Sequence, residues 1–222
     1  MAADEFRDWV LSQDWYQTIE LSEGLVTPGK VDSRRRLRFL EQLDWRDRRV
    51  LDVGCNSGAY CLWAKRHGAA EVVGVDIDER RLAQARRLAE HEGLDVDFQQ
   101  RSLFQLGELG RFDIVLCFAV LTEVQDLIGG LAALAAAIGR QALVELSLAK
   151  PIAYLSRSRS FRKGYATMPR RRAVLELRRH KRGWMIDPSL DVLQTLLGGE
   201  FRVEPRGRSV RYQMVELERV AG

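Results

Sequence analysis

Apolar residues along the chain gather into short runs that alternate with amphipathic stretches. The runs at 50–53, 71–76, 112–118 and 142–148 have the length of strands and are mostly apolar, as strands buried on both faces of a parallel sheet are. A further short strand is expected at 96–99. The stretches 59–67, 79–91 and 124–138 place apolar residues at helical spacing. This alternation predicts an α/β fold with a doubly wound, mostly parallel sheet.

The C-terminal part of the chain departs from this alternation. A helix is expected at 189–197, followed by two segments, 201–205 and 210–217, whose side chains alternate well enough for strands. With Gly207 between them, these two strands are expected to close the sheet as an antiparallel β-hairpin. The prediction is therefore a seven-stranded sheet.

The first 48 residues do not show a strand–helix–strand pattern. A short amphipathic helix is expected at 5–11, then an extended aromatic flap that ends at Pro28-Gly29, then a helix at 34–43. We therefore expect an N-terminal appendage (1–48) on a core that spans 49–222. Trp15 and Tyr16 have two interpretations: they anchor the appendage on the core, or they cover a ligand as a lid.

The segment Gly54-Cys55-Asn56-Ser57-Gly58 lies between the first predicted core strand and its helix. Gly54 and Gly58 allow the backbone to approach a ligand closely, and the N-terminus of the helix offers free N–H groups. Asn56 tolerates a positive φ, so the turn is compatible with it. The next strand ends in Asp76, a carboxylate that can accept both hydroxyls of a ribose.

Two nucleotide sites use such a cradle. A dinucleotide site has the pattern G-x-G-x-x-G/A, and Asn56 at the middle position would crowd a pyrophosphate. The stretch 49–60 closely resembles the cofactor loop of class I methyltransferases, which use S-adenosylmethionine (SAM). In that family the acidic residue of the strand, here Asp52, lies near the methionine ammonium. The resemblance implies a SAM site formed by Asp52, Gly54, Cys55, Asn56, Gly58, Asp76, Ile77, Ser102, Leu103 and Phe118.

A second resemblance covers residues 15–148. W-Y-Q-T-I-E-L, V-T-P-G and V-L-D-V-G-C-N-S-G are similar to segments of the methyltransferases related to the tRNA wobble-uridine carboxymethyltransferases. Those enzymes have an aromatic–His pair after the fourth strand, where this chain has Thr122-Glu123, and they have a longer N-terminal region. The departure favours ordinary methyl transfer over carboxymethyl transfer.

Charge is concentrated in one insertion at about 151–187. The net charge of the chain is +4, but residues 151–182 carry eleven Lys and Arg against one acidic residue, so this segment is +10 and the remainder is −6. A helix is expected at 173–182 and a loop or short helix at 156–165. The insertion could grip RNA phosphates or line the pocket of a small, natural-product-like or anionic acceptor. We favour the small acceptor, with tRNA as the alternative.

Methyl transfer mainly requires alignment, and a base only when the acceptor atom is protonated. Glu123, after the fourth strand, is the first candidate for that base, and Tyr16 is the second. Glu145 lies inside an apolar strand, where an unpaired carboxylate is costly, so we expect it to have a partner.

The remaining chemistry-bearing residues suggest a plain cytoplasmic enzyme. The three histidines are scattered, so no metal site is expected. Cys55, Cys61 and Cys117 are expected to be buried free thiols in a reducing cytoplasm. The N-terminus is acidic and is not expected to be a signal peptide, and the apolar runs are too short for a membrane span.

Overall fold

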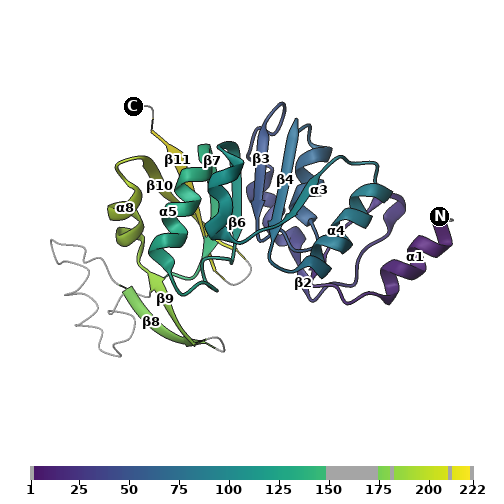
Figure 1. The fold of residues 1–222 in the computed structure, drawn as a ribbon, viewed down its shortest axis with the longest axis horizontal. Coiled ribbons are helices and arrows are strands. Elements are labelled where there is room, and N and C mark those ends of the chain that lie inside the picture. The colour runs from purple at the N-terminus through teal and green to yellow at the C-terminus, as the bar shows by residue number, and fades with distance from the viewer. Residues whose placement is uncertain (1–2, 149–174, 181–182, 210–211, 221–222) are drawn as a thin grey trace.

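A seven-stranded sheet forms the centre of the computed structural model, with strand order β10-β11-β7-β6-β3-β4-β5 (Figure 1). Strands β3 to β7 are parallel, β11 is antiparallel to β7, and β10 is antiparallel to β11. The predicted α/β sheet with a closing hairpin is confirmed. The structure describes residues 3–148, 175–180, 183–209 and 212–220. The bounds are β3 Arg49–Val53, β4 Glu71–Asp76, β5 Asp97–Gln100, β6 Phe112–Phe118, β7 Ile138–Leu146, β10 Phe201–Arg208 and β11 Gln213–Arg219.

Helices cover both faces of the sheet. Helices α3 (Ala59–Arg66) and α4 (Glu79–His91) pack on one face, while the 3₁₀ helix η3 (Leu103–Leu109), α5 (Leu127–Ala137) and α8 (Leu190–Leu197) pack on the other. Helix α4 begins at Glu79 because the Asp78 carboxylate accepts the backbone N–H of Arg80 at 3.0 Å. Each helix buries its apolar stripe, as the sequence spacing predicts.

The sheet is extended in opposite directions from β3. From β3 the chain moves outward to β4 and β5, and it then returns to the other side of β3 to form β6. Loops that leave the carboxyl ends of β3 and β6 therefore diverge, which opens a crevice between them. Ligands of open α/β sheets bind at such a switch point.

The N-terminal appendage shares its hydrophobic core with α3 and α4. Phe6, Val10 and Trp15 are each at most 1% exposed and belong to the same buried cluster as Leu62 and Leu82. Its elements are α1 Ala3–Ser12, β1 Gln17–Thr18, η1 Ser22–Gly24, β2 Val31–Asp32, η2 Ser33–Arg36 and α2 Leu37–Leu40, with β1 and β2 paired in parallel. The predicted helix at 34–43 is thus shorter and partly 3₁₀.

The prediction of a helix at 173–182 is wrong for the residues in this range that the structure describes. Residues Leu175–His180 form strand β8, which pairs antiparallel with β9 (Gly183–Pro188). Leu175 and Leu177 are two residues apart, which is the strand period, and both remain exposed. The hairpin extends from the sheet beside α8 (Figure 1). The prediction for 156–165 lies outside the described residues.

The end of α5 also differs from the sequence prediction. The helix ends at Ala137, and β7 begins at Ile138 and not at the predicted residue 142, so Gly139 lies in the strand. A side chain at Gly139 would place its Cβ 2.9 Å from the carbonyl oxygen of Phe112 in β6. The glycine therefore permits close approach of two strands, which local pattern does not reveal.

Candidate active site

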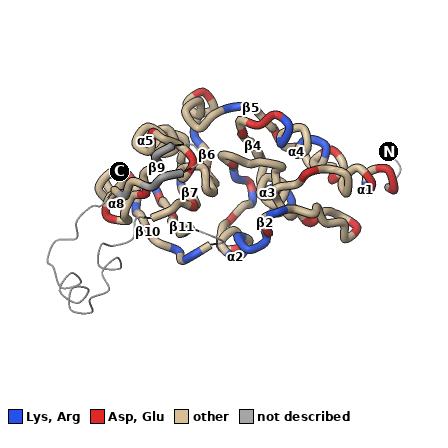
Figure 2. The backbone as a smooth tube through the Cα atoms, turned by 90° about the horizontal axis from the view of Figure 1, so that it is seen from below, with Lys and Arg blue, Asp and Glu red and all other residues tan. Residues whose placement is uncertain are grey.

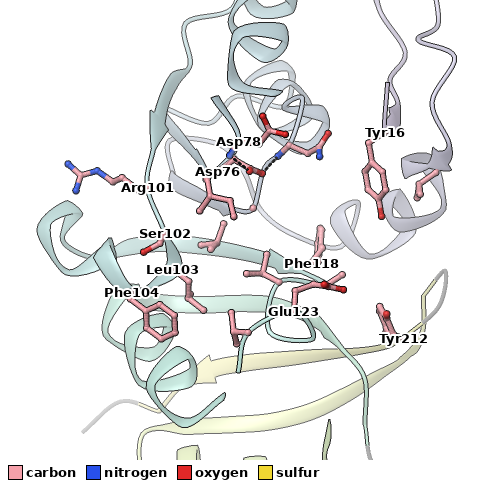
Figure 3. A pocket seen from close by; sticks show the side chains of 18 of the residues that line it. Tyr16, Asp76, Asp78, Arg101, Ser102, Leu103, Phe104, Phe118, Glu123 and Tyr212 are labelled. Carbon is pink, nitrogen blue, oxygen red and sulfur yellow. Dashed lines mark hydrogen bonds between the residues drawn. The ribbon is translucent and has the colours of Figure 1, made fainter. Parts of the chain in front are cut away.

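A cavity of about 690 Å³ opens at the carboxyl ends of β3, β4 and β6 (Figure 3). Nine of the residues predicted from sequence line it: Tyr16, Gly54, Asn56, Asp76, Ile77, Ser102, Leu103, Phe118 and Glu123. Three other predicted site residues, Asp52, Cys55 and Gly58, are not among the lining residues. The cavity thus sits at the switch point of the sheet.

The glycine turn has the backbone conformation expected for it. Gly54 has φ 71° and Asn56 has φ 54°, so the asparagine does adopt the left-handed conformation. A Cβ on Gly54 would lie 2.3 Å from Cγ2 of Val120, which excludes a side chain there. Gly58 contributes differently, since a Cβ there would lie 2.8 Å from the Phe98 ring. Gly58 therefore allows α3 to pack, while Gly54 shapes the cavity.

Asp76 is held in place by two backbone N–H groups. Asn56 donates its N–H to Oδ2 at 2.8 Å, and Asp78 donates its N–H to Oδ1 at 2.9 Å. Each oxygen retains a lone pair that can accept another hydrogen bond. The carboxylate is thus a fixed double acceptor on the cavity wall.

One end of the cavity is mainly apolar (Figure 3). Ile77 and Phe104 line it and are 65% and 51% exposed. Leu103 is buried below them. Ser102 begins η3, where its N–H donates to the Gln105 side chain at 2.9 Å. This end has the character of a slot for a flat heterocycle.

The opposite end is formed by residues from distant segments (Figure 3). Tyr16 comes from the appendage, Phe118 from the end of β6, Glu123 from the loop that follows, and Tyr212 from the β10–β11 connection. Tyr16 is 42% exposed, whereas its neighbour Trp15 is 1% exposed and donates its indole N–H to the Val10 carbonyl at 2.6 Å. Trp15 is therefore the anchor, and only Tyr16 faces the cavity.

Arg36 adds a cation to this end of the wall. Its Nε donates to Oε2 of Glu145 at 2.9 Å, its Nη2 donates to the same oxygen, and its Nη1 donates to the Tyr60 hydroxyl at 3.0 Å. The guanidinium also lies 5.6 Å from the centre of the Phe118 ring. Glu145 is 0% exposed, so the prediction that it requires a partner is confirmed.

Asp52 lies under the turn and is 1% exposed. The Cys61 thiol donates to its Oδ2 at 3.5 Å. Burial raises the pKa of Asp52 to about 7. The three cysteines are free and buried, as predicted, and burial raises the pKa of each thiol.

The loop after β6 adopts a strained conformation beside the cavity. Ala119 has φ 65°, and its N–H donates to the Glu145 carbonyl at 2.8 Å. The Thr122 hydroxyl is turned inward and donates to the Ala119 carbonyl at 2.6 Å. Glu123 follows in this loop, and its side chain is partly exposed on the cavity wall. Backbone strain of this kind often accompanies functional sites.

Sequence reasoning missed four polar residues of the wall, Arg36, Asp78, Arg101 and Tyr212. Arg36 stands in the run Arg34-Arg35-Arg36, and nothing local distinguishes it from its exposed neighbours. Tyr212 lies inside the segment 210–217, which was predicted only as the second strand of the closing hairpin, whereas in the structure it precedes β11. The position of the Glu145 carboxylate inside an apolar strand is the one sequence signal that could have pointed to a buried arginine.

The described residues include neither a metal-binding cluster nor a membrane-spanning helix. Among them, no three His, Cys, Asp or Glu side chains gather closely enough to hold a metal ion. None of the described helices is both long and apolar enough to cross a membrane.

Comparison with known proteins supports a methyltransferase domain. Residues 50–139 match the family described as "Methyltransferase domain". The chain is 33% identical over 118 residues to the ubiquinone biosynthesis O-methyltransferase of Coxiella burnetii, a match that covers 52% of this chain and 48% of that protein. It is 37% identical over 125 residues to the ribosomal protein L11 methyltransferase of Geobacter sulfurreducens, covering 55% and 41%. The chain thus spans about half the length of these relatives.

Solved structures show the same fold. The N-terminal domain of EvdMO1, crystallised in the presence of S-adenosylhomocysteine (SAH) and D-fucose, has a TM-score of 0.72 at 20% identity and covers 100% of this chain and 98% of that one. Magnesium protoporphyrin IX methyltransferase from Synechocystis PCC 6803 with bound SAH has a TM-score of 0.59 at 21% identity, covering 85% and 81%. The chain therefore has the fold of class I methyltransferases, and the family match includes the glycine turn and Asp76. Neither these relatives nor these structures are named as tRNA wobble-uridine enzymes.

Proposed function

We propose that this chain is a SAM-dependent methyltransferase that acts on a small-molecule acceptor. The observation that carries the proposal is the cradle formed by Gly54, Asn56 and Asp76, in a segment that matches the methyltransferase domain family. The turn admits a ligand where a Cβ would not fit, and Asp76 offers two oriented acceptors to ribose hydroxyls.

The two ends of the cavity suggest how the cofactor lies. The apolar slot of Ile77, Leu103 and Phe104 suits adenine, and Asp76 then meets the ribose. The methionine part is left at the opposite end, where Arg36 can bind its carboxylate. Asp52, buried below the turn, supplies negative charge for its ammonium when it is ionised, which its pKa of about 7 allows from neutral pH upward. When bound, SAM supplies an electrophilic methyl group on a sulfonium.

The acceptor is proposed to enter at the same end, between Tyr16 and Tyr212 (Figure 3). Alignment of the acceptor atom with the methyl group and exclusion of water are the main requirements. Both aromatic rings can cover the acceptor and both hydroxyls can bind to it. Glu123 is the carboxylate placed to take the proton of a hydroxyl or amine acceptor.

The alternative acceptor, tRNA, is less well supported. Outside residues 151–182 the chain has a net charge of −6, which repels a polyanion. Acidic and basic residues are interspersed along α4 and the appendage, apart from the short basic run Arg34-Arg35-Arg36 (Figure 2). The buried Thr122 also differs from the aromatic residue of the wobble-uridine enzymes, which favours SAM over a carboxylated cofactor.

The decisive measurement is calorimetry of the whole chain with SAH, with NAD and with carboxy-SAM. We expect micromolar binding of SAH, weaker binding of carboxy-SAM and little binding of NAD. Tight NAD binding without a response to SAH would contradict the proposal. A screen of small acceptors for SAH release then identifies the substrate. A gel shift with tRNA would favour an RNA acceptor instead if binding persisted at physiological salt. The dependence of the logarithm of affinity on the logarithm of salt concentration should then indicate several phosphate contacts.

A further inference from the structure

Arg36 and Glu145 form a buried pair that spans the appendage and the sheet. They are 109 residues apart in the chain, and Arg36 is 9% exposed while Glu145 is 0% exposed. An arginine has five N–H groups. Two of them donate to Oε2 of Glu145 and one donates to the Tyr60 hydroxyl, which leaves one N–H on Nη1 and one on Nη2 of a side chain that lines the cavity.

The surroundings hold the guanidinium on its other sides. Tyr60 donates its hydroxyl to the Ser33 carbonyl at 3.2 Å, and its ring packs edge-on against Phe118 with 5.0 Å between ring centres. The Arg36 guanidinium lies near both rings, at 5.9 Å and 5.6 Å from their centres. Its position is thus determined by Glu145, by Tyr60 and by a residue of the cavity wall.

Stability alone does not account for this arrangement. A buried ion pair commonly contributes no more stability than apolar side chains of the same volume. In addition, the second oxygen of Glu145, Oε1, is buried and has no hydrogen-bond partner among the described residues. A carboxylate that only held the appendage on the sheet would not need to direct its arginine to the cavity.

We propose that Glu145 is a positioning residue for cofactor binding: it orients Arg36 so that the two remaining N–H groups bind the carboxylate of the cofactor's amino-acid end. The inference rests on the proposed function, because it assigns that carboxylate to the Arg36 end of the cavity. It also predicts that the appendage, which carries Arg36, must be docked on β7 for full cofactor affinity.

The sign of the electrostatic effect makes the proposal testable. Removing the Glu145 charge leaves the Arg36 charge less compensated, which by itself would strengthen binding of an anion. A loss of affinity for an anionic ligand therefore reports lost orientation. Orientation matters because guanidinium and carboxylate groups pair through a planar, two-pronged geometry.

The experiment compares SAH with 5′-methylthioadenosine, which has the adenine and ribose but lacks the amino-acid end. Both are titrated by calorimetry into the wild type, Glu145→Gln, Glu145→Leu and Arg36→Lys. Glu216→Gln is the matched control, because Glu216 is a half-buried carboxylate on β11 that pairs with Arg206 at 3.3 Å, away from the cavity. Circular dichroism and thermal melting establish that each variant is folded.

We expect SAH affinity to fall more than tenfold in Glu145→Leu and Arg36→Lys. A smaller fall of about threefold is expected in Glu145→Gln, which retains a neutral acceptor. Affinity for 5′-methylthioadenosine should stay within about twofold in all of them, and Glu216→Gln should change neither ligand.

Three results would overturn the positioning role. They are equal weakening of both ligands by the Glu145 variants, unchanged SAH binding in folded Glu145→Gln and Glu145→Leu, and tighter SAH binding in either. If Glu145→Gln folds and Glu145→Leu does not, the affinities of Glu145→Gln for SAH and 5′-methylthioadenosine decide whether Glu145 has the positioning role. Failure of the wild type to bind either ligand would instead contradict the proposed function, and the two failures are thereby distinguishable.

Discussion

The backbone N–H of Asn56 donates to Oδ2 of Asp76 at 2.8 Å, which ties the glycine turn after β3 to the end of β4. The left-handed conformation of Asn56 directs this N–H toward the neighbouring strand. The hydrogen bond thereby joins the two segments of the proposed cofactor cradle.

Replacing Asp76 with alanine should weaken SAH binding by about 1.5–3 kcal/mol, the range for loss of a charged hydrogen-bond acceptor. Calorimetry measures the change. Asp95→Ala is the matched control, because Asp95 is an exposed carboxylate near β5 and away from the cavity. If both variants bind SAH like the wild type, Asp76 does not contact the cofactor.

Asp52 should make the folded state less stable as the pH rises from about 4 to 7. Burial raises its pKa from 3.8 to about 7, so the folded state holds a proton that the unfolded state has lost in this range. The stabilising contribution is complete below pH 4 and disappears as the pH passes 7. In this window the free energy of unfolding of the wild type, relative to that of Asp52→Asn, should fall by up to about 1.4 kcal/mol per pH unit.

Urea unfolding of both proteins at pH 4.5, 6.0 and 7.5 measures this difference. The pH dependence of Asp95→Asn should match that of the wild type. Parallel curves for the wild type and Asp52→Asn would mean that Asp52 has an ordinary pKa in the folded protein.

Trp15 and Tyr16 should respond to mutation in opposite ways. Trp15→Ala removes a fully buried side chain and should lower the free energy of unfolding by about 3–5 kcal/mol. Tyr16→Ala should leave stability nearly unchanged and lower turnover, because Tyr16 faces the cavity.

Hydrogen exchange of residues 12–30 should slow when SAH binds. Equal exchange with and without SAH would show that the flap does not close over the cofactor.

Glu123→Gln should lower kcat by about 10²–10⁴-fold if the acceptor atom is protonated, because the variant cannot take the proton. SAH affinity should not change. The test uses the acceptor found by the screen, with initial rates measured between pH 6 and 9. A variant with wild-type kcat over this range would show that Glu123 is not the base.

Tyr212→Phe should raise KM for the acceptor about three- to tenfold, through loss of one hydrogen bond. SAH affinity serves as the internal control and should remain unchanged. Among the described residues the Tyr212 hydroxyl has no hydrogen-bond partner, so the variant should unfold like the wild type. A loss of SAH binding without a change in KM would place Tyr212 at the cofactor instead.

The sequence by itself determined the features that depend on neighbouring residues. Strand–turn–helix periodicity predicted the parallel sheet and its closing hairpin, and Gly54, Asn56 and Asp76 were found from the turn chemistry alone. These features follow from short-range rules, because backbone conformation and the period of apolar side chains are set within a few residues.

Only the tertiary structure decided which distant side chains meet. It separated Trp15 from Tyr16, placed Gly139 in a strand, and brought Arg36 from the appendage to Glu145 on β7. The sequence indicated that Glu145 needed a partner, but 109 residues separate it from Arg36, and many arginines could have served. Packing of the appendage on the sheet selects one of them, and that choice is a property of the whole fold.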